Sequence, residues 1–321
     1  MKQATKIWLT AGAFLVLAGF LLFVGAMTLN HWNWSALGSS KMDTRTVEIG
    51  DPFQKISIST DTDDILFAPS GNGSCSIVFL EREKVTHNAA VTDGTLAISV
   101  ADTRNWLDHL VIFSTESPAM TVYLPQNTYD TLTIRESTGD ISIPNDFTFG
   151  SISIDASTGD VECLSSASDT IRIHLDTGDI RMENLSAKDL DLKVSAGRMD
   201  LRNIFCTGNV KADFTTGKSE FYGVFCKSFL SAGDTGDISL TDIIAEEEMR
   251  IERTTGDVEF ARCDASSLTV KTDTGDVEGT LLTGKVFLTK SDTGKIDVPG
   301  TTEGGRCEIT TDTGDIKISV K

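Results

Sequence analysis

Residues 251–279 read IERTTGDVEFARCDASSLTVKTDTGDVEG, and they contain the turn Thr-Gly-Asp twice at a spacing of 19 residues. Ten versions of this turn run from residue 138 to the C-terminal end, and successive turns are 19 or 20 residues apart. A period that regular is typical of a solenoid, in which each repeat stacks on the next. The glycines at the centres of the ten turns are Gly139, Gly159, Gly178, Gly197, Gly217, Gly236, Gly256, Gly275, Gly294 and Gly314.

The residues on both sides of each turn alternate between apolar and polar. Two and four residues after the glycine, nine of ten positions are apolar, as at Val258 and Phe260, while Glu259 between them is polar. The same alternation precedes the turns, as at Ile152 and Ile154. Period-two alternation is typical of a strand with one buried face. We therefore predict an all-β fold, a single-stranded, β-helix-like solenoid of 19–20-residue coils. Ten coils at about 4.8 Å each make a rod about 48 Å long.

The chemistry of the turn explains its composition. Glycine adopts a positive φ without steric cost, and we predict that conformation at each of the ten corners. Seven of the ten residues after the glycine are Asp. Their carboxylates either accept hydrogen bonds from turn amides or line a calcium row. That row consists of Asp237, Asp257 and Asp276, helped by Asp234 and Asp273.

The structural alternative is favoured for this Asp column. One straight ladder supplies fewer oxygens than the six to eight that calcium prefers. Arg198, Lys218 and Lys295 also interrupt the column. No metal and no cofactor are therefore predicted.

Residues 7–29 contain no charged residue. A 23-residue helix is long enough to cross a bilayer, and Lys2 and Lys6 before it favour a cytoplasmic N-terminus over residues 1–6. We predict a single-pass anchor in the cell membrane that contacts lipid, with the rest of the chain outside the cytoplasm. A cleaved signal peptide is the alternative, although this apolar stretch is longer than such signals usually are.

The rest of the chain divides into three parts. We expect residues 30–46 to form a polar tether and residues 47–125 to form an irregular β head. Residues 126–321 contain the regular repeats. The one weak helical pattern after the anchor covers residues 245–252. An uncovered final coil would invite pairing at its edge, and Lys317 and Lys321 are predicted to guard it.

Six cysteines occur, without a C-x-x-C pair. Cys206 and Cys226 each follow their repeat glycine by nine residues, which stacks them on adjacent coils about 4.8 Å apart. That separation permits a disulfide. Two buried thiols that pack as small apolar groups are the alternative.

Composition and motifs argue against several functions. A net charge of −19 disfavours nucleic acid, because phosphate binding depends on Lys and Arg. The four histidines are scattered, and no G-x-S-x-G or H-E-x-x-H motif occurs. Polysaccharide-active β-helix enzymes usually carry loops that wall a groove, but the coil length here is constant, so we do not predict an enzyme.

Aromatic residues cluster in two neighbouring coils. They either pack in the core or form an exposed ligand-binding patch, and core packing is favoured. The cluster consists of Phe205, Phe214, Phe221, Tyr222, Phe225 and Phe229.

Three segments before the repeats carry a family resemblance. They read FQKISISTDTDDI at 53–65, TDGTLAISV at 92–100 and MTVYLP at 120–125. Followed by the repeated T-G-D ladder, they resemble bacterial DUF4097 proteins, β-strand-repeat proteins also called adhesins, over residues 45–321. The resemblance implies a β-helix-like solenoid, a membrane anchor in Gram-positive bacteria and an envelope location. It carries over no catalytic residue.

The leading functional hypothesis is a non-catalytic, adhesin-like interaction or scaffold module at the cell surface. It would bind a cell-wall glycan or an envelope protein, and an exposed aromatic row on one face would support it. The first alternative is an envelope-stress or regulatory partner of a membrane protein. The second alternative is a polysaccharide-active enzyme, which predicts carboxylates clustered in a groove.

Overall fold

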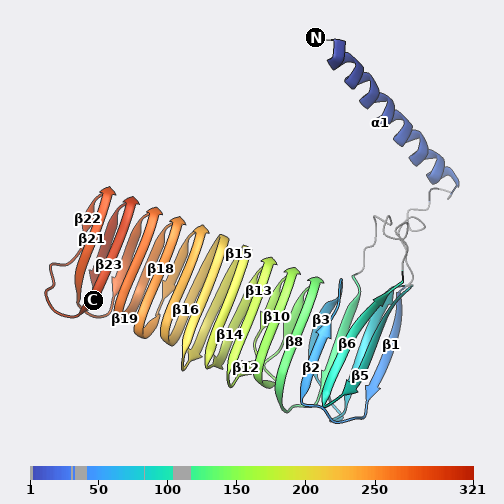
Figure 1. The fold of residues 1–321 in the computed structure, drawn as a ribbon, viewed down its shortest axis with the longest axis horizontal. Coiled ribbons are helices and arrows are strands. Elements are labelled where there is room, and N and C mark those ends of the chain that lie inside the picture. The colour runs from blue at the N-terminus through green and yellow to red at the C-terminus, as the bar shows by residue number, and fades with distance from the viewer. Residues whose placement is uncertain (1–2, 30–31, 33–41, 83, 104–116) are drawn as a thin grey trace.

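The structure is a computed structural model that describes residues 3–29, 32, 42–82, 84–103 and 117–321 (Figure 1). One helix, α1 (Gln3–Leu29), covers the predicted anchor segment. Among the described residues, no helix combines the length and apolar character that crossing a membrane requires, so the anchor stays a prediction. Trp34 and most of the predicted tether lie outside the described residues.

In the described residues, 24 strands belong to one continuous hydrogen-bonded sheet that winds into a solenoid. The head strands are β1 (Met42–Ile49), β2 (Lys55–Ser59), β3 (Asp64–Pro69), β4 (Cys75–Arg82), β5 (Val85–Thr92), β6 (Thr95–Asp102) and β7 (Ala119–Leu124). The first repeats contain β8 (Thr128–Thr138), β9 (Ile141–Ile143), β10 (Thr148–Thr158), β11 (Val161–Cys163), β12 (Ser166–Ala167), β13 (Thr170–Thr177) and β14 (Ile180–Ala187). The remaining strands are β15 (Asp189–Cys206), β16 (Asn209–Thr235), β17 (Ile238–Thr241), β18 (Ile244–Thr255), β19 (Val258–Thr274), β20 (Val277–Leu281), β21 (Lys285–Thr293), β22 (Ile296–Asp297), β23 (Gly305–Thr313) and β24 (Ile316–Val320).

Each repeat is one coil, and neighbouring coils pair in parallel. In β15 and β16, Leu190 pairs with Val210 before the corner, Gly197 with Gly217 at the corner, and Leu201 with Phe221 after it. The strand that enters a corner and the strand that leaves it therefore form two layers. Their inward side chains build one core along the whole rod. The all-β solenoid of about ten turns agrees with the sequence prediction.

A second corner lies six residues after each glycine in the middle coils. Its residues also have a left-handed backbone: φ is 53° at Asn203, 65° at Gly223 and 56° at Asp242. Asn and Asp tolerate this conformation better than other non-glycine residues, which suits them to the position. Each middle coil thus has two tight reversals, one at Thr-Gly-Asp and one at this second corner.

The N-terminal end of the rod is closed by antiparallel strands. The coil of β2 and β3 lies between the coil of β6 and β7 and the first repeat, because β2 pairs with β6 and β8, and β3 with β7 and β9. Strand β5 then pairs antiparallel with β6, β4 with β7, and β1 with β4. Since β1 begins at Met42, the predicted tether is too long: residues 42–46 are held in the sheet.

The coil order at the C-terminal end departs from the chain order. Strands β23 and β24 insert between the coil of β19 and β20 and the coil of β21 and β22. The coil around Gly294 is therefore outermost, and the predicted edge guards Lys317 and Lys321 do not lie on the final coil. That expectation was wrong.

Two sets of outward side chains favour this insertion. Lys317 pairs with Glu278 on one side and Asp297 on the other. In chain order, those two carboxylates would be neighbours and would repel by about 0.9 kcal/mol in water. Likewise, Thr310 separates Lys271 from Lys290. At these two positions the inserted coil replaces a like-charge contact with a favourable or neutral one, whereas at the corner it places Asp315 next to Asp276.

Two further sequence expectations are settled by the structure. Residues 245–252, the weak helical pattern, lie in strand β18, because Ala245, Met249 and Ile251 turn into the core. Cys206 and Cys226 are both free and buried, so the thiol alternative holds. Burial raises the pKa of each thiol to about 12, which keeps it protonated and unreactive.

Candidate functional site

The ten Thr-Gly-Asp corners form a continuous ridge. All ten glycines have a positive φ, between 130° and 158°, as the motif predicts. A Cβ on Gly256 would lie 2.2 Å from the carbonyl oxygen of Gly236, and one on Gly275 would lie 2.0 Å from that of Gly256. Glycine is therefore needed both for the backbone conformation and for the close stacking of the coils.

The Asp column of this ridge forms a hydrogen-bonded ladder. The Asp257 amide donates to Oδ1 of Asp237 at 3.0 Å, and the Asp276 amide donates to Oδ1 of Asp257 at 2.8 Å. The Asp315 amide donates in turn to Oδ1 of Asp276 at 2.7 Å. Each carboxylate thus binds the amide one coil further along the rod, which supports the structural alternative for the column.

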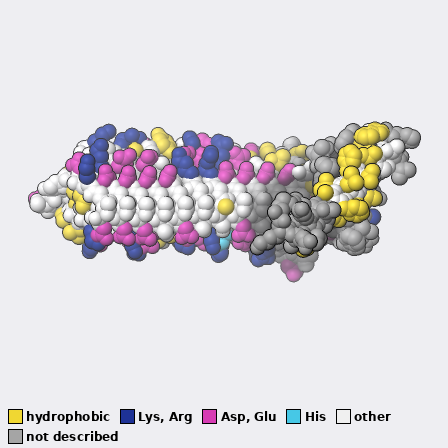
Figure 2. Space-filling view, turned by 90° about the horizontal axis from the view of Figure 1, so that it is seen from above, with side chains coloured by type: hydrophobic (Ala, Val, Ile, Leu, Met, Phe, Trp, Pro, Cys, Tyr) yellow, Lys and Arg dark blue, Asp and Glu magenta, His cyan; other side chains and the backbone are white. Residues whose placement is uncertain are grey.

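Acidic side chains run in rows on both sides of a strip that carries few charged or hydrophobic groups (Figure 2). Within the described part of the chain, no group of three or more His, Cys, Asp or Glu residues is arranged to hold a metal ion. The amides of the next coil engage one oxygen of Asp237, Asp257 and Asp276, which leaves fewer oxygens for a cation.

The aromatic cluster divides into core and surface members. Phe214, Phe221 and Phe229 are buried, as core packing predicts. Phe205 and Tyr222, however, are 51% and 49% exposed. The sequence could not separate the two groups, because buried and exposed aromatic residues occur together in the same neighbouring coils.

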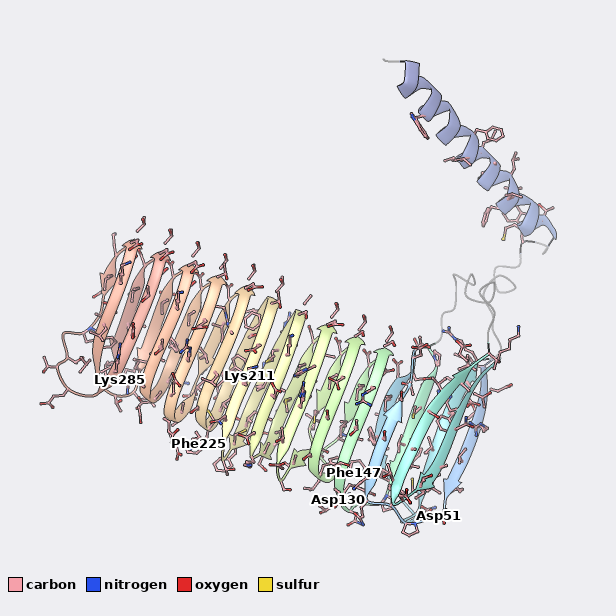
Figure 3. All side chains as sticks on the ribbon, viewed as in Figure 1. Asp51, Asp130, Phe147, Lys211, Phe225 and Lys285 are labelled. Carbon is pink, nitrogen blue, oxygen red and sulfur yellow. The ribbon has the colours of Figure 1, made fainter. Side chains whose placement is uncertain are left out.

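The exposed members gather around the second corner. The rings of Phe205 and Phe225 stack across adjacent coils, with centroids 5.3 Å apart and planes inclined by 7°. Tyr222 precedes the corner residue Gly223, and Phe225 follows it. We call Phe205, Tyr222 and Phe225 the aromatic corner. In Figure 3, Phe225 lies at the lower edge of the rod.

Polar side chains flank the aromatic corner along the same row. Asn203 donates through Nδ2 to Oδ1 of Asn184 at 2.9 Å on one side. On the other side, Arg262 donates through Nε to Oδ1 of Asp242 at 2.7 Å. An apolar ring surface beside amide and charged groups can bind a ligand that has an apolar face and a polar rim.

A shallow groove of about 660 Å³ begins one coil beyond Tyr222 and extends toward the C-terminal end, and none of the three residues of the aromatic corner lines it. Tyr222 pairs with Thr241, and Thr241 pairs with Ala261, so small side chains follow the tyrosine along one row. Thr280 and Ser319 extend this lining. We call this depression the hydroxyl groove. Glu259, Glu278 and Lys317 also line it, so it offers both acceptors and donors.

A second polar cluster, which the sequence did not reveal, lies buried in the head. Nε2 of His87 lies 2.9 Å from Oδ2 of Asp63, and Nδ1 lies 3.1 Å from Oε1 of Glu81. Arg45 pairs with Glu81 at 2.8 Å and donates to the His87 carbonyl. In the sequence, only the alternation at Val85, His87 and Ala89 pointed to this cluster, because it places the His87 side chain on the inward face of the strand.

The pKa shifts in this cluster follow from burial and pairing. Burial alone would raise the pKa of Glu81, but hydrogen bonds from Arg45 and His87 outweigh it and lower the pKa to about 2. For His87, the carboxylates of Asp63 and Glu81 overcome burial and raise the pKa. His87 is only 1% exposed, and both of its ring nitrogens contact carboxylates. The cluster therefore connects β1, β4 and β5 to Asp63, the residue before β3.

Burial also raises the pKa of the neighbouring Glu136 carboxyl to about 8. Its Oε1 accepts the Asp63 amide at 3.1 Å, and it occupies a core column that continues with Ala156 and Leu175. A neutral carboxylic acid fits that column better than a carboxylate, because ionisation would place a charge in the core.

The fold and these surfaces define a class: an all-β solenoid with a polar ridge, an exposed aromatic corner and a shallow groove. The sequence profile of the family described as Toastrack DUF4097 matches residues 53–217 and 223–321. The chain belongs to this family, as the sequence resemblance indicated. No curated protein matches the chain in sequence.

Three solved structures are similar to this chain, each with a TM-score below 0.5. A protein from Bacteroides fragilis named a putative adhesin is 17% identical and has a TM-score of 0.47, covering 75% of this chain and 98% of its own. A putative adhesin from Parabacteroides distasonis is 10% identical with a TM-score of 0.49 and the same coverage. A protein from P. distasonis named a putative lipid binding protein is 14% identical with a TM-score of 0.47, again with that coverage.

Proposed function

We propose that this protein is a non-catalytic interaction module of the cell envelope that binds a wall glycan through its aromatic corner. The stacked pair of the exposed Phe205 and the half-buried Phe225 carries this proposal, with the exposed Tyr222 near it. Soluble β-proteins rarely leave large aromatic rings exposed without a use, and the C–H face of a pyranose ring stacks on such rings. The neighbouring amide and carboxylate groups suit the sugar hydroxyls.

The hydroxyl groove gives the ligand a direction. It starts next to Tyr222 and follows the long axis of the rod across several coils. Thr241, Thr280 and Ser319 offer hydroxyl groups along it, at a repeat of about 4.8 Å per coil. A polymer that lies along this axis meets the aromatic corner first and then a regular series of polar groups.

Binding to purified cell wall and to a glycan array tests the proposal. The double variant Phe205→Ala/Phe225→Ala should bind at least about tenfold more weakly, since losing two aromatic contacts removes about 1.5–3 kcal/mol. Leu66→Ala is the matched control, because Leu66 is an exposed apolar side chain on β3, far from the aromatic corner in the stack. Wild-type protein that binds neither wall nor glycan would contradict the proposal.

The same variants distinguish the regulatory alternative. If photo-crosslinking from position 225 in intact cells recovers a polytopic membrane protein instead of wall material, the module acts as a partner of that protein. Loss of this crosslink in Phe205→Ala would then assign the aromatic corner to a protein interface.

We further propose that residues 7–29 attach the module to the cell membrane. The support is the apolar surface of α1, whose exposed large side chains are Trp8, Phe14, Leu15, Val16, Leu17, Phe20, Leu21, Leu22 and Phe23. Apolar surface of this extent needs lipid or protein to cover it. After an alkaline carbonate wash the full chain should stay in the membrane pellet. A chain recovered in the supernatant would contradict the attachment.

A further inference from the structure

The outermost coil at the C-terminal end leaves two strands without a neighbour on one side. We call residues 282–299 the terminal coil. Among the described residues, β21 pairs only with β23, and β22 pairs only with β24. Their outer backbone N–H and C=O groups therefore form an open edge, which can pair with another strand.

The terminal coil also exposes apolar side chains. The described β body has seven large hydrophobic side chains that are exposed, and four of them lie in this one coil. These four are Leu282, Val286, Leu288 and Ile296, which are 40%, 36%, 49% and 45% exposed. Ile296 occupies a column that is buried in the coils behind it, as at Ile316 and Val277. The core of the solenoid is therefore open at this end.

The opposite end differs. Strand β1 forms one edge there, and its exposed side chains are Asp43, Thr44, Thr46 and Glu48. Such polar and charged residues protect an edge strand from pairing. The head thus has the polar outer face that a solenoid needs at each end, and the terminal coil lacks it. Among the described strands, β1 and β5 also pair on one side only, so polar side chains and not backbone pairing protect the head against head-to-tail growth.

The terminal coil is held firmly enough to present a preformed edge. Nζ of Lys285, labelled in Figure 3, lies 2.5 Å from Oδ1 of Asp264 and 2.7 Å from Oγ1 of Thr283. The Lys285 side chain is only 4% exposed. A buried ion pair therefore ties the start of β21 to the coils behind it.

Charge permits a second copy of this chain as the occupant, because the terminal coil is the nearly neutral end of an acidic rod. The whole protein carries a net charge of −19, but residues 282–299 contain three lysines and two aspartates, a net charge of +1. When two rods meet at these ends, their acidic bodies stay apart, because each further coil lies about 4.8 Å farther from the contact between the two copies. A two-fold axis also generates the antiparallel strand pairing that one open edge can make with itself.

We propose that two copies of the protein associate end to end through antiparallel pairing of β21 with β21 of the second copy. The pairing continues the sheet across the two-fold axis and covers Val286 and Leu288. The closed dimer carries two aromatic corners, so it binds a polymeric ligand at two points and gains avidity. The dimer itself does not depend on which ligand the aromatic corner binds.

The mass of the full chain in mild detergent, measured by light scattering after gel filtration, tests the dimer. We expect twice 34.6 kDa for the wild type. The double variant Val286→Lys/Leu288→Lys should be a monomer, because it places four lysines at the two-fold axis. Leu66→Lys is the matched control, since Leu66 is 45% exposed on an inner coil, and it should stay a dimer.

Crosslinking supplies a second readout that does not depend on detergent. All six native cysteines are buried, so a bifunctional maleimide reports on an introduced cysteine. Leu288→Cys should give a crosslinked dimer, and Leu66→Cys should not. A wild type that remains monomeric at about 100 µM, a dimer that survives the double lysine variant, or crosslinking of Leu288→Cys only to a different protein would overturn the proposal.

Discussion

Replacing Gly256 by Ala tests whether the corners hold the solenoid together. The residue has φ of 142°, and an added Cβ would lie 2.2 Å from the Gly236 carbonyl oxygen and 2.6 Å from its carbonyl carbon. Both contacts are with backbone, so no side chain can move aside. The coils at this corner must separate or change their dihedral angles.

The cost follows from these two effects. A non-glycine residue in such a conformation costs about 1–3 kcal/mol, and moving the coils of Gly236 and Gly256 apart weakens the hydrogen bond from the Gly236 amide to the Thr255 carbonyl. We expect a total loss of about 3 kcal/mol, which lowers the melting temperature by about 6–12 °C for a protein of this size.

Circular dichroism during heating gives the measurement, with Gly71→Ala as the matched control. Gly71 has no atom within 4 Å of an added Cβ, and its φ is not in the left-handed range. The control should melt at the wild-type temperature or up to about 4 °C above it, since Gly→Ala at an unstrained site stabilises by about 0.4–1 kcal/mol. If Gly256→Ala also melts like the wild type, the stacking argument for the corners is refuted.

Three further predictions concern charge. Lys317→Glu should lower the free energy of unfolding by about 1–2 kcal/mol, because it stacks a carboxylate between Glu278 and Asp297. Lys321→Glu is the control, and denaturant titration measures the free energy of unfolding of both variants. Glu136 has a folded-state pKa raised from 4.5 to about 8, so the folded state binds the extra proton and stability should fall as the pH rises from about 4.5 to 8. Glu136→Gln should flatten this dependence in melting curves taken across that range, and an unchanged slope would contradict the assignment. Asp257→Asn keeps an oxygen that can accept a hydrogen bond from the Asp276 amide and should melt close to the wild type, whereas Asp257→Ala should melt at a lower temperature. If calorimetry shows that the wild type binds calcium, the Asp column is a cation site instead.

Much of the architecture could be read from the sequence because the repeat is local. The spacing of Gly256 and Gly275 sets the coil length, and the alternation at Val258 and Phe260 sets which side chains turn inward. Both signals act within about 20 residues, so a single repeat contains them. The positive φ of the corner glycines follows from the same local steric argument.

The candidate site was only partly predictable. The sequence showed an aromatic cluster in two coils but not which rings face solvent, because Phe221 and Phe225 differ only by their position around the second corner. The corner depends on the backbone of Gly223, which no repeat motif marks. The head cluster of Asp63, His87 and Glu81 joins three separate segments, and their pairing has no local signature.

The sequence by itself determined the unit of this protein: a coil of 19 or 20 residues with a glycine corner and one inward face. Only the tertiary structure decided the order of the coils at the ends, where β24 lies between β20 and β22. The physical reason is that the corners are nearly identical, so local geometry permits several stacking orders. Contacts between coils, such as Lys317 with Glu278 and Asp297, choose among them, and they leave the terminal coil as the open end of the rod.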